Sequence, residues 1–393
     1  MSQYQELRNF LTSRQPGMFD LLRRMVEIQS HSYNKVGNGR MMALIASEFE
    51  NSSLTGTEIV QETFGNHLVV RSHATSNFST QVLLVGHTDT VFPEDSAFKQ
   101  YSEDGQNCYG PGVIDMKGGL TVGIYALKAL DAFGLLSNIP VTFIFNSDEE
   151  IGSRSSGSII RQEARKSLFS LVLECGGMDG EIVTGRKGNM SVRMETFGKA
   201  GHAATSGQNK ASAVLELAHK IILFENLNDP SRNITANAGK ISGGIGPNTV
   251  ADYAMAGIDV RYENPSDKAQ LEEKIEQITA ANYVSGVTTQ VQIVSGRPPM
   301  QRNAKNRRLF NMLKTVATDL NMDIKEEFRF GVSDANLIAD ENTPVIDGLG
   351  PIGADDHSEK EYMIKETLLE RTVLLACSIP ACWQKYADCI GSS

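Results

Sequence analysis

The sequence is poor in the features that mark several large classes of protein. It has five cysteines among 393 residues, and no two of them have the Cys-x-x-Cys spacing of redox or metal motifs. Their small, odd number favours a reducing compartment, so we expect a cytoplasmic protein. No apolar run approaches the roughly 18 residues that cross a bilayer. The first residues are polar and mixed in charge, without the apolar segment of a secretory signal, and we expect no membrane partner.

The chain also lacks a concentration of basic residues. It contains 37 basic and 47 acidic side chains, which gives a net charge of −10. The nearest approach to a basic cluster is Lys305, Arg307 and Arg308, which fit the exposed face of a helix. Nucleic-acid binding depends mostly on neutralising phosphates, so we expect no nucleic-acid partner.

Three nucleotide and nucleophile motifs are missing as well. Residues 110–115 have aspartate where a dinucleotide fingerprint needs glycine. Gly198-Lys199 lacks the upstream glycine and the following serine or threonine of a phosphate-binding loop. The nearest approach to a Gly-x-Ser-x-Gly nucleophile turn is residues 331–335, which do not match it. These absences argue against a nucleotide-dependent enzyme and against a serine hydrolase.

What is present has the pattern of an α/β protein. Hydrophobic residues make up 40% of the chain and charged residues 21%, an ordinary globular balance. The first ~55 residues show the apolar spacing of helices. Short β-rich runs then alternate with helices, of which residues 118–134 are the clearest amphipathic example. We therefore expect an α/β fold with a mostly parallel sheet covered by helices.

The pattern changes at about residue 186. Residues 186–300 follow the order β-α-β-β-α-β, which is typical of a ferredoxin-like α+β domain. After this segment the alternation of helices and strands resumes. We expect residues 1–185 and 301–393 to form one α/β domain, interrupted by an inserted domain at 186–300.

Acidic and imidazole side chains recur where the predicted strands end. Open α/β sheets place their sites at the carboxyl ends of strands, so these segments are expected to converge. Buried carboxylates and imidazoles are costly unless they are paired or bind a metal. The five segments are residues 86–91, 110–119, 148–153, Glu174 and residues 355–358.

Such a concentration of carboxylate and imidazole favours a pair of divalent cations. These groups are the usual zinc ligands of hydrolytic sites, and two cations that share a carboxylate can activate water and polarise a carbonyl together. Glu149 and Glu150 point in different directions on an extended backbone, so one can bind metal while the other moves a proton. Taken alone, each segment has a simpler interpretation: Glu149-Glu150 as a solvated loop, and Asp115 as the cap of the next helix.

Several spaced motifs occur together in one order: GHTDTVFP, GPGVIDMKGG, NSDEEIGSRSS, GKAGHA, IDVRY and GRPPMQRN, with PVIDGLGPIGADDHSEKEYM downstream. In these motifs the chain resembles the M20 family of co-catalytic zinc peptidases. The resemblance extends nearly end to end and is strongest to the glutamate carboxypeptidases. The family also includes acetylornithine deacetylase, succinyl-diaminopimelate desuccinylase and aminoacylase-1. It implies a hydrolase with a zinc-peptidase-like sheet, whose inserted ferredoxin-like domain serves as lid and dimerisation domain.

The resemblance assigns metal ligands among the acidic segments. It implies two zinc ions per chain, with cobalt or manganese as possible substitutes. His87 and Glu174 would hold one ion, Glu150 and His357 would hold the other, and Asp115 would bridge both.

Two further residues gain roles beside the ligands. Asp89 would orient His87 from outside the ligand set, and Glu149 would be the general base that later protonates the leaving nitrogen. The resemblance also implies a cis peptide bond between Asp115 and Met116.

The remaining assignments concern the inserted domain. His202 in GKAGHA would reach the partner's site in a homodimer and stabilise the oxyanion. Arg297 would bind the substrate α-carboxylate, which suits the fork of a guanidinium, and Asn248 would help from a neighbouring loop. Arg261 is the rival anchor, although an arginine on a strand more often forms a structural ion pair.

The favoured function is cleavage of an amide or peptide bond next to an amino acid with a free carboxylate, in a small molecule or short peptide. The alternative within the enzyme class is an N-acyl amino acid deacylase. The alternative from a different class is a non-catalytic binding protein on the same fold. Residues 330–335 read Phe-Gly-Val-Ser-Asp-Ala where carboxypeptidase members of the family often have Gly-Gly-Gly-Thr-Asp-Ala, a departure that bears on glutamate specificity.

Overall fold

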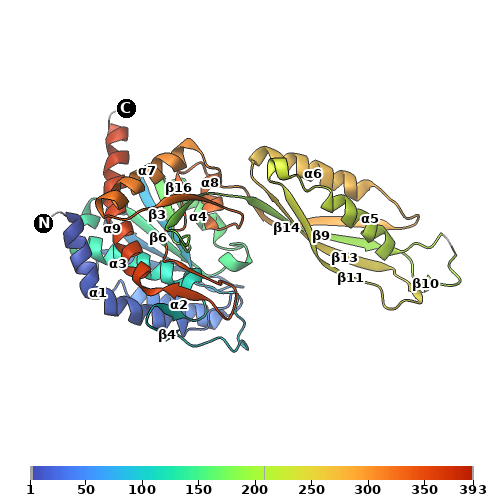
Figure 1. Ribbon diagram of the computed structural model, residues 1–393, viewed down its shortest axis with the longest axis horizontal. Helices are drawn as coiled ribbons and strands as arrows, with labels where there is room; N and C mark the ends of the chain where they lie inside the picture. Colours follow the sequence, from blue (N-terminus) through green and yellow to red (C-terminus); the bar gives the residue numbers. More distant parts are fainter. Residues whose placement is uncertain (1–2, 208, 392–393) are drawn as a thin grey trace. The chain divides into compact units, whose positions relative to one another are not determined.

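The computed structural model describes residues 3–207 and 209–391 (Figure 1). The chain divides into two compact units. The described part of the first unit contains residues 3–185, 302–328 and 333–391, and that of the second contains residues 186–207, 209–301 and 329–332. Each unit has a hydrophobic core of its own.

A six-stranded sheet forms the centre of the first unit. In spatial order its strands are β1 (Leu54–Ile59), β2 (His67–Ser72), β6 (Val141–Asn146), β3 (Gln81–His87), β7 (Ser167–Val172) and β16 (Val345–Ile346). The pairs β6–β3, β3–β7 and β7–β16 are parallel, whereas β1–β2 and β2–β6 are antiparallel. The connection between β1 and β2 is too short for a crossover, so these strands form an antiparallel edge. The prediction of a mostly parallel sheet is confirmed.

Helices of the first unit pack around this sheet. They are α1 (Gln3–Val26), α2 (Lys35–Ser47), α3 (Gly118–Ala132), α4 (Gly157–Ala164), α7 (Ala304–Asp319), α8 (Asp334–Asp340) and α9 (Lys365–Gly391). Helix α9 contacts α1, α3 and α7, and α4 contacts α8. In the described part of the chain, no helix combines the length and the apolar character that crossing a membrane requires.

Helix α3 lies close against the sheet because two of its positions are glycine. A Cβ atom on Gly119 would lie 1.9 Å from the carbonyl oxygen of Leu173, and one on Gly123 would lie 2.5 Å from the ring of Phe143. Side chains at these positions would push the helix away. The close approach brings the start of α3 next to the residue that follows β7.

Short strands and helical turns complete the first unit. One small antiparallel sheet has the order β17 (Gly353–Ala354), β18 (Tyr362–Ile364), β5 (Asn107–Tyr109) and β4 (Ser102–Glu103). Strands β8 (Glu181–Arg186) and β15 (Lys325–Arg329) form another. The helical turns are η1 (His73–Ser76), η2 (Val113–Lys117), η3 (Leu135–Ser137) and η4 (Glu149–Ile151). The sheet around β18 joins two segments that are far apart in the sequence.

The second unit has the expected β-α-β-β-α-β order. Its elements are β9 (Gly188–Phe197), α5 (Ala213–Glu225), β11 (Thr235–Gly243), β13 (Tyr253–Tyr262), α6 (Pro265–Ala280) and β14 (Thr288–Arg297), with the short strands β10 (Gly201–His202) and β12 (Thr249–Val250) and the turn η5 (Pro230–Arg232). The antiparallel sheet has the order β11-β13-β9-β14. Alternate residues of β13 are buried, as expected for a sheet with helices on one face.

A buried lysine ties the two helices of this unit together. Lys220 in α5 donates hydrogen bonds to the carbonyl oxygens of Ile278, Thr279 and Ala281, at the end of α6. Its ammonium group also lies 3.3 Å from Glu216, and both side chains are fully buried. The lysine thus satisfies carbonyl groups that a helix end leaves without a partner.

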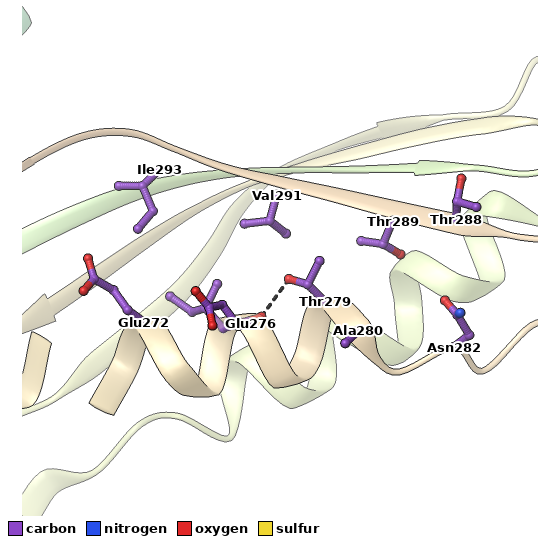
Figure 2. Close-up of a pocket in the computed structure, with 10 residues that line it drawn as sticks. Glu272, Glu276, Thr279, Ala280, Asn282, Thr288, Thr289, Val291 and Ile293 are labelled. Atoms are coloured by element: carbon purple, nitrogen blue, oxygen red, sulfur yellow. Dashed lines mark hydrogen bonds between the residues drawn. The ribbon is translucent and has the colours of Figure 1, made fainter. Parts of the chain in front are cut away.

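A groove of about 590 Å³ lies between α6 and β14 in the second unit (Figure 2). Apolar side chains of Ile275, Val291 and Ile293 line it together with the carboxylates of Glu272 and Glu276. The groove contains none of the site residues expected from the sequence. This groove is therefore separate from the predicted chemistry.

Candidate active site

Five predicted ligands come from five segments at one edge of the central sheet. His87 is the last residue of β3, Glu150 lies in η4 just after β6, and Glu174 follows β7. Because β6, β3 and β7 are parallel neighbours, their carboxyl ends meet at this edge. Asp115 is supplied by the turn before α3, and His357 by the turn between β17 and β18.

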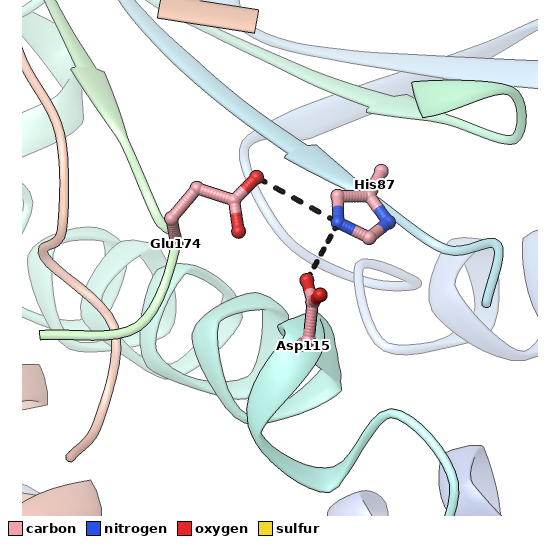
Figure 3. Close-up of side chains that lie close together, drawn as sticks. All are labelled: His87, Asp115 and Glu174. Carbon is pink, nitrogen blue, oxygen red and sulfur yellow. Dashed lines mark hydrogen bonds and ion pairs between the residues drawn. The ribbon is translucent and has the colours of Figure 1, made fainter. Parts of the chain in front are cut away.

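Asp115 lies between two imidazoles. Its Oδ1 atom is 3.1 Å from Nε2 of His87, and its Oδ2 atom is 3.1 Å from Nε2 of His357. Nε2 of His87 is also 3.6 Å from Oε1 of Glu174 (Figure 3). Nε2 of His357 is 3.3 Å from Oε2 of Glu150. The side chains form two trios that share one carboxylate, with one oxygen turned toward each trio.

The donor set and its spacing fit two divalent cations. Zinc binds imidazole nitrogen and carboxylate oxygen at about 2.0–2.2 Å, so two ligand atoms around a tetrahedral ion lie roughly 3.4 Å apart. The nitrogen–oxygen distances of 3.1 to 3.6 Å within each trio are close to this value. In each trio the potential ligand atoms all lie within 4.8 Å of one another. Asp115 is placed to contribute one oxygen to each ion.

Burial and crowding shift the acidities of the carboxyl groups. Burial, reinforced by the charge of Asp115, raises the pKa of Glu150 to about 8. Burial also raises the pKa of Glu174 well above its ordinary value, against the opposing attraction of His87. These carboxyl groups lie where negative charge is poorly solvated, which is the environment that a cation relieves.

The pKa values of the two imidazoles are raised as well, because carboxylates surround them. Hydrogen bonds to Asp115 and Glu150 raise the pKa of His357 to about 11. Burial lowers the pKa of His87, but the surrounding carboxylates outweigh this effect and leave that pKa well above its ordinary value. Burial alone would raise the pKa of Asp115, but hydrogen bonds from both imidazoles hold it below its usual range. In this structure the imidazoles supply the positive charge that the carboxylates need.

Asp89 organises more of the site than the sequence suggested. Its carboxylate lies 3.4 Å from Nδ1 of His87, and its own backbone carbonyl lies 3.0 Å from the same atom. The carboxylate also accepts hydrogen bonds from the backbone N–H groups of Glu149 and Glu150 and from the hydroxyl of Ser32. One fully buried aspartate thus orients a predicted ligand and fixes the η4 turn.

Glu149 is a neighbour of Glu150 in the sequence, and its charge acts on members of both trios. It directly precedes Glu150 in η4, and it is half-buried. Its charge is among the influences that raise the pKa values of Glu150 and Glu174. Because Glu150 and Glu174 belong to different trios, the carboxylate of Glu149 is within electrostatic reach of each.

The structure places His202 and Asn248 side by side in the second unit. Strand β10 pairs with β12, with His202 opposite Thr249, and the backbone carbonyl of Asn248 accepts a hydrogen bond from Ala203. Nδ1 of His202 accepts the backbone N–H of Ala204. The ring proton of the neutral imidazole is therefore on Nε2, and both predicted side chains are exposed.

The two candidate arginines have different surroundings. Arg297, the last residue of β14, is buried, and its backbone N–H donates to Asn189. Arg261 on β13 forms an ion pair with Asp259 at 2.7 Å and donates to the carbonyl oxygen of Phe330 at 2.8 Å. Arg261 is thus engaged in the structural ion pair that the sequence analysis left open for it.

The peptide bond between Asp115 and Met116 is cis, as the family resemblance implied. Both residues lie within η2 and have non-helical backbone angles, just before α3 begins. Asp115 is therefore not a regular helix cap, which was the simpler interpretation of this position.

Three buried charged residues that the sequence analysis did not select support the ligand-bearing loops. Asp148 accepts hydrogen bonds from Ser155 and Ser156, which closes the loop that holds Glu150. Glu361 accepts backbone hydrogen bonds from the Asp115 loop, and burial raises its pKa to about 7. Lys117 donates to two backbone carbonyl oxygens, and burial lowers its pKa to about 7. Their positions inside the motifs DEE, EKEYM and DMKGG are the only signal the sequence offers.

Residues 330–335 are divided between the two units: residues 330–332 belong to the second unit, and residues 333–335 belong to the first. Ser333 caps the start of α8. Asp334 is buried and accepts hydrogen bonds from Asn146 at the end of β6 and from Ser153. The second half of this divergent segment therefore supports the strand end that leads to Glu150.

A mostly parallel α/β sheet with two carboxylate–imidazole trios at its strand ends defines a class of metal-dependent hydrolases. The sequence pattern of peptidase family M20/M25/M40 matches residues 83–380. The chain belongs to this family and is a hydrolytic enzyme, so the resemblance is confirmed and the non-catalytic alternative is set aside. The family implies divalent metal ions and small peptide substrates.

Individual relatives agree on the family but differ in activity. Carboxypeptidase G2 of Pseudomonas sp. (strain RS-16) is 25% identical over 375 residues, which are 94% of this chain and 89% of the relative. Succinyl-diaminopimelate desuccinylase of Corynebacterium glutamicum is 27% identical over 275 residues, 68% of this chain and 71% of the relative. In structure, the metallo-carboxypeptidase Sso-CP2 of Sulfolobus solfataricus aligns with a TM-score of 0.75 and 15% identity, covering 93% of this chain and 98% of that one. The fold is that of M20 metallopeptidases.

The shared Asp115 leads to a prediction about metal content. After reconstitution with zinc and desalting, elemental analysis is expected to find two ions per chain. His357→Ala should lose one ion and keep the other, because the trio of His87, Asp115 and Glu174 is left intact. His73→Ala, at an exposed histidine outside both trios, is the matched control and should keep two. A single ion in the wild type, or two in His357→Ala, would contradict this assignment.

Proposed function

We propose that the protein is a dinuclear zinc hydrolase that cleaves an amide bond beside an amino acid with a free carboxylate, as a carboxypeptidase does. The observation that carries the proposal is the position of Asp115 between His87 and His357, with one oxygen facing each imidazole. The similarity to carboxypeptidase G2, which extends over 94% of the chain, supports a carboxypeptidase activity. When bound, the two cations would polarise the scissile carbonyl and lower the pKa of water.

The chain's own residues supply the proton transfers. Glu149, half-buried and within reach of both trios, takes the proton of the attacking water. It then delivers this proton to the nitrogen that leaves, so that one carboxylate serves as base and as acid. Asp89 accepts a hydrogen bond from the backbone N–H of Glu149. It thereby fixes the position of the residue that carries the proton.

Glu149→Gln is expected to lower turnover by about 10²- to 10⁴-fold, the usual size of a general acid–base contribution. Glutamine keeps the size of the side chain but cannot accept the proton. The zinc content should stay at the wild-type level, which elemental analysis of the same sample checks. Glu50→Gln, an exposed carboxylate remote from η4 in sequence, is the control. Near wild-type turnover in Glu149→Gln would show that another group moves the proton.

Arg297 is the proposed anchor of the substrate carboxylate. A guanidinium grips a carboxylate with two parallel hydrogen bonds, and the chain's net charge of −10 makes a local cation necessary to hold an anionic substrate. Arg297 is buried, which strengthens an ion pair made there. Arg261 is the rival candidate, and its guanidinium contacts Asp259 and the carbonyl oxygen of Phe330. Asn248 would contribute a neutral donor.

Arg297→Ala is expected to cost about 2–5 kcal/mol in kcat/KM for a substrate with a free α-carboxylate, as for other broken desolvated charge pairs. It should cost far less for the same substrate with that carboxylate amidated. Arg297→Lys, which keeps the charge but not the fork, should fall between wild type and alanine. Arg261→Ala should affect acid and amide equally. Equal losses for both substrates in Arg297→Ala would rule out carboxylate recognition by this residue.

A deacylase acting on N-acyl amino acids is the second candidate. The desuccinylase of Corynebacterium glutamicum, 27% identical over 68% of the chain, favours it. Both candidates release an amino acid with a free carboxylate, and they differ in the group on the other side of the amide. A panel of N-acyl amino acids and of dipeptides, assayed with added zinc, separates them.

The protein is further proposed to be a homodimer through the second unit. Strand β11 is an edge of its sheet, and α5 packs beside it. Exposed apolar side chains lie on or next to these two elements, namely Val214 and Ile222 on α5, Ile241 on β11 and Ile245 just beyond it. An unpaired edge strand next to an apolar helix face suits a second copy related by a two-fold axis.

His202 would complete the partner's site in this dimer. It pairs with Thr249 in β12, four residues after the exposed Ile245. Because Nδ1 accepts a hydrogen bond, Nε2–H is the donor of the neutral ring. This group is a suitable donor to an oxyanion.

Mixing inactive His202→Ala chains with inactive Glu149→Gln chains is expected to restore up to about a quarter of wild-type turnover. Half of the dimers would be hybrids, and each hybrid would contain one intact site of two. Ile241→Lys should abolish the dimer, as measured by sedimentation, and with it the recovery of turnover. Ile293→Lys, on the opposite edge strand β14, should abolish neither. No recovery after confirmed exchange of subunits would reject a role in trans.

A further inference from the structure

Glu361 is a carboxylate in an unusual position. It lies just before β18 and is fully buried. Its Oε1 accepts the backbone N–H groups of Ile114, at 2.9 Å, and Asp115, at 3.1 Å. Its Oε2 accepts the backbone N–H of Gly112 at 2.9 Å. One side chain therefore satisfies three backbone donors of a single loop.

These donors need an acceptor from outside their own segment. The backbone at Asp115 and Met116 is not helical, so the turn cannot form the regular hydrogen bonds of the helix that follows it. Buried N–H groups without a partner destabilise the folded chain. A carboxylate is the strongest acceptor that the protein can provide for such a cluster. The loop conformation that presents Asp115 thus depends on Glu361.

Glu361 also connects two ligand-bearing segments. It follows His357 by four residues, whereas the loop that it holds precedes it by 246 to 249 residues. Next to it, β18 pairs with β5, which leads into that same loop, with Tyr362 opposite Tyr109. The turn of His357 is itself closed by Ser358 and Glu361, whose backbone N–H groups donate to Asp355 and Ser358. A displacement of Glu361 would therefore move Asp115 and His357 together.

We propose that Glu361 is a positioning residue that holds the backbone of residues 112–115 in register with the His357 turn, so that Asp115 and His357 present their ligand atoms to one cation. This inference rests on the proposed dinuclear site. Glu361 does not touch the reacting atoms, and its effect is transmitted through the hydrogen-bonded loop.

The expected effect is a loss of cation affinity without a loss of the fold. Residues that orient metal ligands from outside typically change metal affinity 10- to 100-fold when they are mutated. Glu361→Ala is expected to weaken the binding of the more weakly held zinc ion by this factor. Glu361→Gln, which keeps the shape but turns an amide donor toward one backbone N–H, should cause a smaller loss. Glu359→Gln, at an exposed carboxylate two residues away, is the matched control and should bind zinc as the wild type does.

Two measurements on the full-length chain test the proposal. Zinc affinity is measured by competition with a chromophoric chelator, on samples whose circular dichroism matches that of the wild type. Amide hydrogen exchange is measured on the zinc-free protein for the peptide that covers residues 110–117. Faster exchange there in Glu361→Ala, together with weaker zinc binding, is the expected result. If Glu361→Ala does not fold, Glu361→Gln provides both measurements.

Unchanged exchange at residues 110–117, or wild-type zinc affinity in both Glu361 variants, would overturn the proposal. A change in global stability with unchanged zinc affinity would show a merely structural role and would overturn it as well. Failure of the proposed function is a separate result, because neither readout uses turnover. If the wild type binds no second ion, faster exchange of the Asp115 loop in Glu361→Ala still supports the positioning, and unchanged exchange overturns it.

Discussion

The site depends on one constraint, which is that Asp115 must face two imidazoles at the same time. Each of its carboxylate oxygens lies 3.1 Å from a different histidine, so neither trio can shift without disturbing the other. Bringing these groups together concentrates carboxyl groups where water is largely excluded. The pKa values of Glu150 and His357 are raised because of this crowding. A pair of divalent cations resolves the same conflict more completely than protons do.

The sheet provides the convergence, and buried carboxylates provide the precision. Parallel pairing of β6, β3 and β7 brings three strand ends to one edge. That alone does not aim a side chain, because the residues that follow a strand lie in loops. Asp89, Asp148 and Glu361 each accept several hydrogen bonds from such loops. Backbone N–H groups bonded to buried carboxylates thus hold the predicted ligands in place.

The second unit combines a buried contact between its helices with exposed strand edges and exposed polar side chains. A lysine sealed between α5 and α6 keeps its two helices together, and its sheet has two free edges, β11 and β14. His202 in β10 and Asn248, which directly precedes β12, are brought together by the pairing of these two short strands, although they lie 46 positions apart in the sequence.

Much of this protein follows from local sequence patterns. The alternation of helices and strands, the β-α-β-β-α-β order of the second unit and the position of acidic residues after strands all rest on short-range periodicity. The spaced motifs identified the family and the cis bond after Asp115. The roles of Asp89 as an anchor of Glu149 and Glu150, of Asp148, and of Glu361 were not accessible in this way. These roles depend on hydrogen bonds to backbone groups, which for Asp89 and Glu361 lie 60 or more positions away in the sequence. In the sequence, a carboxylate that binds a distant loop cannot be distinguished from one that faces water. The sequence alone determined which chemistry the chain carries, whereas only the tertiary structure decided which carboxylates hold that chemistry in place, because burial and long-range contacts exist only once the chain has folded.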